Sequence, residues 1–195
     1  MIVPTVPQGL LLFLLGGVFL YFLQAGSRTF YYTDSASEPG ATVGQLSFLL
    51  TGTIPIWFLG LHQAIPSSNG IAAALLLTLS VTVYEWARQT IWGRRFGLGW
   101  GEQVPDALCA TGPYRYIRHP IYLGYQLAFL AALIALPHWS TAAIFLVNAA
   151  LFTYAALDDE RKLAASPLAA DYAAYRERTG MFLPKFRVTA AGPGR

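Results

Sequence analysis

The sequence predicts an all-α integral membrane protein with five transmembrane helices and a cytosolic, amphipathic C-terminal helix. Of its 195 residues, 55% are hydrophobic and only 12% are charged, whereas about a quarter are charged in ordinary soluble domains. The apolar residues form long runs separated by polar turns, and about 20 such residues span the hydrocarbon core. The basic residues gather on alternate connections between these runs, which is the arrangement that the positive-inside rule requires.

The first three spans are predicted from apolar runs at residues 9–23, 43–61 and 71–90. No Lys or Arg precedes the first run, so it lacks the basic region of a secretory signal peptide, and we expect a retained anchor. Residues 27–42 carry charges and turn formers and predict a loop. The Pro66–Gly70 turn is short, so we expect the second and third spans to be antiparallel neighbours.

The last two spans form a predicted hairpin at residues 120–136 and about 139–157, joined only by Pro137 and His138. Pro120 suits the first turn of a helix, where its missing N–H would be unpaired in any case. The final helix is predicted from Leu168, Tyr172, Tyr175 and Thr179, which repeat at helical spacing among charged residues.

The orientation follows from the 13 Lys and Arg residues. All of them fall on the first connection, on the segment between the third and fourth spans with its helix ends, or on the C-terminal tail. With five spans these regions share one side of the membrane, which the positive-inside rule assigns to the cytosol. We therefore expect the N-terminus outside and the C-terminus inside.

Composition also limits the classes of partner. A single cysteine, Cys109, excludes an internal disulfide. The net charge of +3 is not gathered on a soluble basic face, which argues against nucleic acid. The three histidines and one cysteine lack metal-ligand spacing, so we expect no metal, and His62 and His138 fall on the far side of the membrane.

A candidate site follows from the predicted hairpin. Arg118 and His119 stand at the start of its first helix, where the helix dipole and a guanidinium fork attract anions. The acidic cluster that contains Glu160 stands at the end of its second helix. Because the two helices run out and back, these ends are adjacent, and the pair could bind a zwitterion. Glu85 and Arg88 share one face of the third span, and we expect an interfacial ion pair rather than a catalytic one.

The motifs at these positions resemble a known superfamily. They are Gly112, Pro113 and Tyr114, then Arg118, His119, Pro120, Tyr122 and Gly124, and after the hairpin Glu160, Leu163, Tyr172, Tyr175, Gly180 and Pro184. Together they resemble the isoprenylcysteine carboxyl methyltransferase and phospholipid methyltransferase superfamily, over about residues 93–186. Each motif alone is weak, and their combination is specific.

The resemblance implies an integral membrane methyltransferase that binds S-adenosylmethionine on the cytosolic side and methylates a lipophilic acceptor entering from the bilayer. It assigns residues 1–92 to an acceptor-side scaffold, 93–186 to the cofactor-binding core and 187–195 to a tail. Arg118 and Glu160 are the candidate catalytic residues. The implied cofactor-binding residues are Gly112, Pro113, Tyr114, Arg118, His119, Pro120, Tyr122, Gly124, Glu160, Tyr172 and Tyr175.

Some positions leave alternatives open. Asp159 stands where the superfamily usually has a glutamate, and we expect it to be solvated because a further desolvated carboxylate beside Glu160 would be unfavourable. Tyr172 and Tyr175 suit packing as well as ligand contact. Sterol-type reductases, which bind NADPH, share a similar C-terminal region, although Ile121 and Gln126 argue against that activity. A non-catalytic membrane module that binds a nucleotide or a lipid headgroup also stays open.

Overall fold

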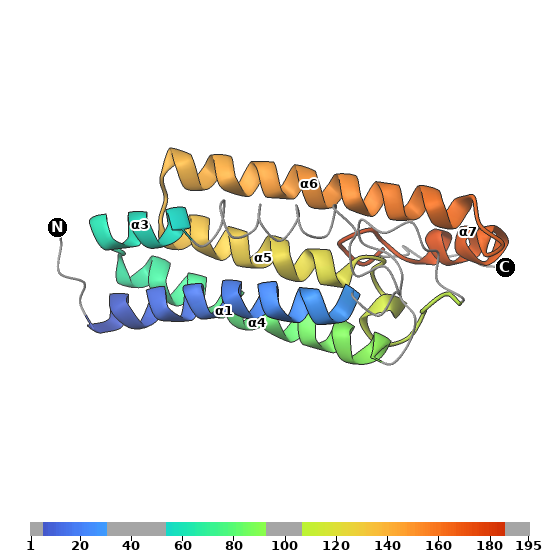
Figure 1. The fold of residues 1–195 in the computed structure, drawn as a ribbon, viewed down its shortest axis with the longest axis horizontal. Helices are drawn as coiled ribbons and strands as arrows, with labels where there is room; N and C mark the ends of the chain where they lie inside the picture. Colours follow the sequence, from blue (N-terminus) through green and yellow to red (C-terminus); the bar gives the residue numbers. More distant parts are fainter. Residues whose placement is uncertain (1–5, 31–53, 93–106, 186–195) are drawn as a thin grey trace, which may run out of the picture.

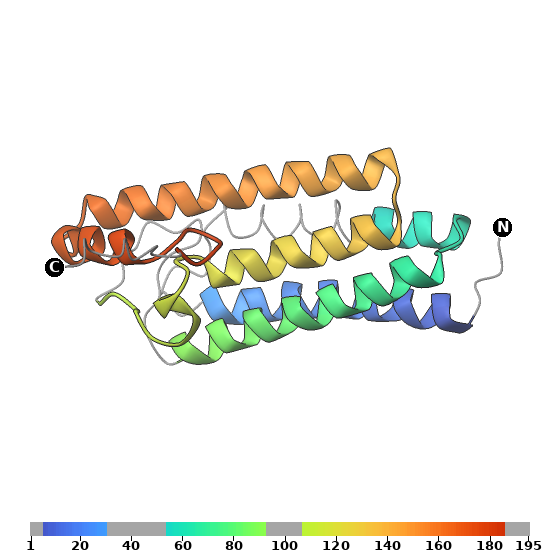
Figure 2. The same cartoon turned by 180° about the vertical axis from the view of Figure 1, so that it is seen from behind.

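Four long helices of the protein lie roughly along one axis, with shorter elements at both ends (Figure 1). The computed structural model describes residues 6–30, 54–92 and 107–185. Its elements are α1 (Val6–Phe30), α3 (Ile54–His62), α4 (Ser67–Ile91), the 3-10 turn η2 (Gly112–Arg115), α5 (Pro120–Ala135), α6 (Trp139–Ala164) and α7 (Ala169–Arg178). Seen from either side, α1, α4 and α6 run in one direction and α5 returns between them (Figures 1 and 2). The prediction of a helical fold is confirmed for the described residues.

Three helices within the described ranges are long and apolar enough to cross a membrane. They are Gln8–Ala25 within α1, Ser67–Ile91 and Trp139–Ala164, and the shorter α5 is also apolar. At about 1.5 Å per residue, the 25 residues of α4 extend over about 37 Å, beyond the roughly 30 Å of the hydrocarbon core. The predicted span at 43–61 lies largely outside the described residues, and α3 covers only its end. The count of five spans therefore stays a prediction.

The core is formed where α1, α4 and α5 pack together. Phe22 of α1 contacts Tyr84 of α4 and Tyr125 of α5, with ring centroids 4.6 and 5.1 Å apart. Gly124 lets α5 approach α4 closely: a Cβ at that position would lie 3.0 Å from the Cβ of Tyr84. The Ser80 hydroxyl donates to the Gly124 carbonyl at 2.6 Å. This packing holds the start of α5 at a fixed position.

Helix α6 continues past the predicted end at Leu157 to Ala164. A polar run does not end a helix when some of its residues are buried, and Ala156, Asp159, Glu160 and Leu163 recur on the inward face at helical spacing. At its other end, α6 is capped by His138, whose Nδ1 accepts from the Ser140 N–H at 3.3 Å. The acidic cluster therefore belongs to the helix itself.

The ends of the bundle differ in chemistry. The described Lys and Arg side chains lie at the end where α4 and α6 finish and α7 folds back, whereas His62 and His138 lie at the opposite end (Figure 1). Exposed tryptophans mark both ends, Trp86 and Trp92 on α4 and its C-cap and Trp139 at the start of α6, as is usual at membrane interfaces. The candidate site lies at the basic end.

Candidate functional site

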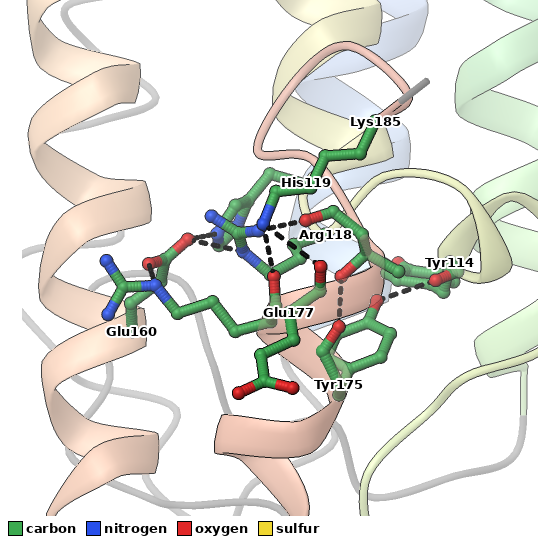
Figure 3. Close-up of polar contacts among 9 residues, drawn as sticks. Tyr114, Arg118, His119, Glu160, Tyr175, Glu177 and Lys185 are labelled. Atoms are coloured by element: carbon green, nitrogen blue, oxygen red, sulfur yellow. Dashed lines mark hydrogen bonds and ion pairs between the residues drawn. The ribbon is translucent and has the colours of Figure 1, made fainter. Parts of the chain in front are cut away.

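The centre of the site is a buried ion pair between the chain segment that enters α5 and the last turns of α6. The Arg118 Nε donates to Glu160 Oε1 at 2.8 Å, and the two side chains are only 8% and 5% exposed. The same oxygen lies 3.2 Å from His119 Nε2, and Arg176 of α7 approaches the other oxygen at 3.6 Å. Figure 3 shows these side chains around the Glu160 carboxylate. The structure therefore brings together the two predicted halves of the site.

Backbone pairing fixes the segment that carries Arg118 and His119. Ile117 and Gly180 form an isolated parallel bridge. The N–H groups of Arg118 and His119 donate to the carbonyls of Gly180 and Met181, at 2.8 and 3.1 Å. Arg118 also uses Nη1 to donate to the Thr179 carbonyl. The chain that follows α7 is thus attached to the start of α5 and closes that side of the site.

Lys185 and Gly180 stabilise the segment that follows α7. Lys185 Nζ donates to the carbonyls of Arg176 and Glu177, at 2.7 and 3.3 Å, and so caps the last turn of α7 (Figure 3). Gly180 is required because a Cβ there would collide with the Leu183 carbonyl. Gly180 therefore belongs to a tight turn that follows α7 and leads back toward the site.

A pocket lies beside the Arg118–Glu160 pair. Its lining residues are Leu108, Cys109, Tyr114, Arg118, His119, Pro120, Ile121, Tyr122, Asp159, Leu163, Tyr172 and Tyr175. Aromatic and aliphatic side chains form most of its wall, with the polar groups of α5 and α6 on one side. All twelve residues come from the stretch that the sequence assigned to the cofactor-binding core.

Asp159 corrects a prediction made from the sequence. It is only 3% exposed, and its Oδ2 accepts from the Tyr122 hydroxyl at 2.8 Å inside the pocket. The prediction of a solvated Asp159 is wrong because α6 continues as a helix, which turns Asp158 outward and Asp159 inward. Asp158 is the more exposed of the two, and it pairs with Lys162 at 2.6 Å.

The two tyrosines of α7 have different roles in the structure. The Tyr175 hydroxyl donates to the Tyr114 carbonyl at 2.7 Å and so joins α7 to η2 (Figure 3). The Tyr172 hydroxyl is buried near Glu160 but makes no hydrogen bond of ordinary geometry to the described residues. Burial raises the pKa of both hydroxyls, so both stay protonated. Tyr172 thus keeps a donor directed at the site.

Four of the predicted cofactor-binding residues do not line the pocket. Gly112 has a φ of +55°, and it packs against Thr90 at the end of α4. Pro113 is buried in η2 and Gly124 packs against α4. Glu160 contacts Arg118 and His119, which line the pocket, but does not line it itself. These residues shape or charge the pocket from outside it, and their assignment to the cofactor stays a prediction.

Some features of the site were not predicted. Leu108, Cys109, Ile121 and Leu163 line the pocket, yet apolar residues in a hydrophobic chain give no signal of their own. The burial of Asp159 was recognisable from its helical spacing with Ala156 and Leu163. Within the described residues, no group of three or more His, Cys, Asp or Glu side chains is placed to hold a metal ion.

Glu85 and Arg88 lie at the same end of the bundle but form a separate pair. Their side chains are 2.7 Å apart and are each about a fifth exposed. The Arg88 guanidinium also lies 4.9 Å from the ring centroid of Trp92. The predicted pairing of Glu85 with Arg88 is confirmed, and neither residue lines the pocket.

The model of the isoprenylcysteine carboxyl methyltransferase (ICMT) family matches residues 75–165. The matched segment begins inside α4, where the sequence showed no motif, and ends just after α6, so Tyr172 and Tyr175 follow it. No curated protein matches the chain.

The matched segment holds both halves of the ion pair, Arg118 and Glu160, and most of the pocket wall. Its family is one of membrane methyltransferases, in agreement with the apolar helices of the bundle. The recognition from motifs is thus confirmed over residues 75–165, the segment that matches the isoprenylcysteine carboxyl methyltransferase family and supplies most of the pocket wall.

Proposed function

We propose that the protein uses S-adenosylmethionine to methylate a lipophilic acceptor at the cytosolic surface of a membrane. The observation that carries this proposal is the Arg118–Glu160 ion pair beside the pocket. Two motifs whose combination resembles the superfamily meet there, through residues 42 apart in the chain. A surface anchor would not require such a buried contact.

The polar groups of the pocket suit the amino-acid end of the cofactor. Arg118 Nη2 makes no hydrogen bond to the described residues, so the fork retains donors for a carboxylate. Glu160, which does not line the pocket, would hold this fork in place through its ion pair with Arg118. The buried Tyr172 hydroxyl lies near Glu160 without a hydrogen bond of ordinary geometry, and a ligand oxygen or nitrogen would supply one.

The apolar side chains of the pocket suit the remainder of the cofactor. Tyr114 and Tyr122 present rings to the pocket, and Leu108 and Leu163 add aliphatic surface. Pockets for small ligands usually combine such walls with a few fixed polar groups. When bound, the cofactor supplies an electrophilic methyl group on a sulfonium. The protein would supply alignment and exclusion of water.

The acceptor determines what else the chain must do. A carboxylate acceptor is already a nucleophile and needs no general base. An amine acceptor must first lose a proton, and Asp159 is the pocket carboxylate that would take it. Both an isoprenylcysteine-like carboxylate and a phospholipid-like amine are therefore candidates.

The placement of the pocket suggests two routes of entry. It lies at the charged end of the bundle, near α7, where a polar cofactor would enter from the cytosol. The acceptor would arrive laterally between the helices, with residues 1–92 as its scaffold and 93–186 as the cofactor core. The pocket residues, which fall between Leu108 and Tyr175, support this division.

Calorimetric titration of the purified full-length protein with S-adenosylhomocysteine and with NADPH tests the proposal. We expect S-adenosylhomocysteine to bind and NADPH not to bind. Binding of NADPH alone would identify a reductase, and binding of neither would favour a non-catalytic module. The Arg118→Ala variant, titrated in parallel, should lose the S-adenosylhomocysteine signal if binding occurs at this site.

A further inference from the structure

Gln126 of α5 carries a polar group that the cofactor site does not use. Its Nε2 atom is buried and makes no hydrogen bond to the described residues, although the side chain as a whole is half-buried. An amide nitrogen without a partner in apolar surroundings lowers the stability of a fold. Polar side chains inside membrane helices commonly mark functional positions. Gln126 therefore needs a partner that the described chain does not supply.

The position of Gln126 relates it to the pocket. It follows Tyr122 by four residues, so the two side chains lie on the same side of α5. Tyr122 lines the pocket and donates to Asp159 of α6. Four residues correspond to about 6 Å along the helix. Helix α5 runs away from the charged end of the bundle (Figure 1). Gln126 therefore lies about one turn beyond Tyr122, on the membrane side of the pocket.

The surroundings of this turn are apolar and aromatic. Phe152 of α6 packs against the rings of Tyr122 and Tyr125, with centroids 5.8 and 5.2 Å apart, and Phe129 follows at 6.5 Å. Water is scarce at such a position in a membrane. A partner for the Gln126 amide would therefore arrive from the bilayer, as part of a lipophilic molecule.

The chemistry of the amide limits that partner. Nε2 carries two N–H donors and no acceptor, so it pairs with an oxygen atom such as that of a carboxylate or carbonyl. We propose that Gln126 is a positioning residue for the methyl acceptor, which it holds by donating a hydrogen bond to an acceptor oxygen on the membrane side of the cofactor pocket. This inference rests on the proposed function. It favours an amphiphile whose carboxylate or carbonyl oxygen stands beside the methylated atom.

The transfer step is consistent with an amide in this role. With a carboxylate acceptor, an oxygen lone pair forms the new bond to the methyl carbon while the carbon–sulfur bond breaks and its electron pair returns to sulfur. The product is a neutral methyl ester, and no proton is moved. An uncharged amide can therefore hold one carboxylate oxygen while the other attacks, without taking part in proton transfer.

The inference is tested on full-length protein in lipid nanodiscs with the variants Gln126→Leu and Gln89→Leu. Gln89 is an exposed glutamine of α4 with one long contact to Glu85, so it is the matched control. Three measurements are made: thermal unfolding for the melting temperature, titration for the affinity for S-adenosylhomocysteine, and steady-state kinetics for kcat and KM of methylation of N-acetyl-S-farnesylcysteine. Phosphatidylethanolamine in the nanodisc serves as the amine acceptor.

For Gln126→Leu we expect a melting temperature equal to or above that of the wild type, because an unsatisfied donor has been removed. S-adenosylhomocysteine affinity should stay within twofold, and kcat/KM for the farnesylcysteine should fall at least tenfold, mainly through KM. The Gln89→Leu variant should match the wild type in all three measurements. A merely structural role would instead lower the melting temperature and leave KM unchanged.

Failure of the inference is distinguishable from failure of the proposed function. If the wild type binds S-adenosylhomocysteine and methylates the farnesylcysteine, but Gln126→Leu does so with an unchanged KM, the inference alone is overturned. Methylation of phosphatidylethanolamine only, or of neither acceptor, also overturns it while cofactor binding still stands. No binding of S-adenosylhomocysteine by the wild type overturns both.

Discussion

Arg118 and Glu160 are 42 residues apart in the chain, and the Arg118 Nε and Glu160 Oε1 atoms lie 2.8 Å apart in the fold. Arg118 also donates to the Thr179 carbonyl, so one guanidinium joins α5, α6 and the segment after α7. The site is therefore charged before any ligand arrives. A charged ligand would therefore bind an arginine and a glutamate that are already paired with each other.

The first prediction concerns this pair. Arg118→Ala leaves Glu160 buried with fewer positive partners, and removal of one member of a buried pair costs about 3–5 kcal/mol. We expect a lower melting temperature and loss of S-adenosylhomocysteine binding. Arg118→Lys keeps the charge but loses the planar fork, so it should retain more stability than affinity. Calorimetry and thermal unfolding in detergent measure both effects.

Lys162→Ala is the control for the Arg118 variants. Lys162 pairs with Asp158, but both side chains are about a third exposed, and such pairs contribute about 0–1 kcal/mol. Stability and affinity should both stay close to wild type. An Arg118→Ala protein that bound S-adenosylhomocysteine as tightly as this control would refute the assignment of the site.

The second prediction separates two neighbouring acids. Asp159→Asn keeps the size of the side chain but removes the charge that faces the pocket, so cofactor affinity should fall at least tenfold, about 1.4 kcal/mol. Asp159→Glu keeps the charge and adds one methylene group in a packed position, so part of the affinity should remain. Asp158→Asn, on the exposed side of α6, should leave affinity unchanged. Equal affinities for Asp159→Asn and Asp158→Asn would show that the buried carboxylate does not contact the cofactor.

The third prediction contrasts the hydroxyls of α7. Tyr172→Phe removes a buried donor without an ordinary hydrogen bond, so the ligand-free protein should keep its melting temperature while S-adenosylhomocysteine binds more weakly. Tyr175→Phe leaves the Tyr114 carbonyl without its donor, and a buried unsatisfied group costs about 1–3 kcal/mol. This variant should be less stable. The reverse order of stabilities would contradict the roles assigned to the two hydroxyls.

The fourth prediction concerns orientation. The basic residues that the structure describes lie at the end of the bundle with α7, and the connection from α3 to α4 lies at the other end (Figure 2). A fluorescent protein fused after Arg195 should therefore be fluorescent in the cytosol. Alkaline phosphatase inserted in the connection at residues 63–66 should be active only outside. Phosphatase activity from a fusion after Arg195 would invert the topology and remove the site from the cytosol.

The parts of the fold that sequence could predict are those with a local cause. Apolar runs marked the helices, and Pro120 marked the start of α5. The motif residues Arg118 and Glu160 were paired correctly because a short hairpin determines which helix ends meet. Asp159 was misjudged because charge in a sequence suggests exposure, whereas its exposure depends on the rotation of α6 against Tyr122.

The contacts that could not be predicted depend on distant packing. No local pattern indicates that Ile117 would bridge Gly180, or that the Thr179 carbonyl would accept from Arg118. Gly124 was assigned to a cofactor motif from sequence, yet its contacts are with Ser80 and Tyr84 of α4. A glycine in a motif thus indicates that another part of the molecule approaches the backbone closely. Which part approaches depends on the tertiary fold.

The bridge between Ile117 and Gly180 joins the segment before α5 to a segment that is synthesised after α6. The helices from α1 to α6 are complete before residue 165 is made, and each can enter the membrane as it is synthesised. The carbonyls of Thr179, Gly180 and Met181, which hold Arg118 and His119, exist only later. A chain that ends before Thr179 would therefore contain α1 to α6 but lack the backbone contacts that hold Arg118 and His119.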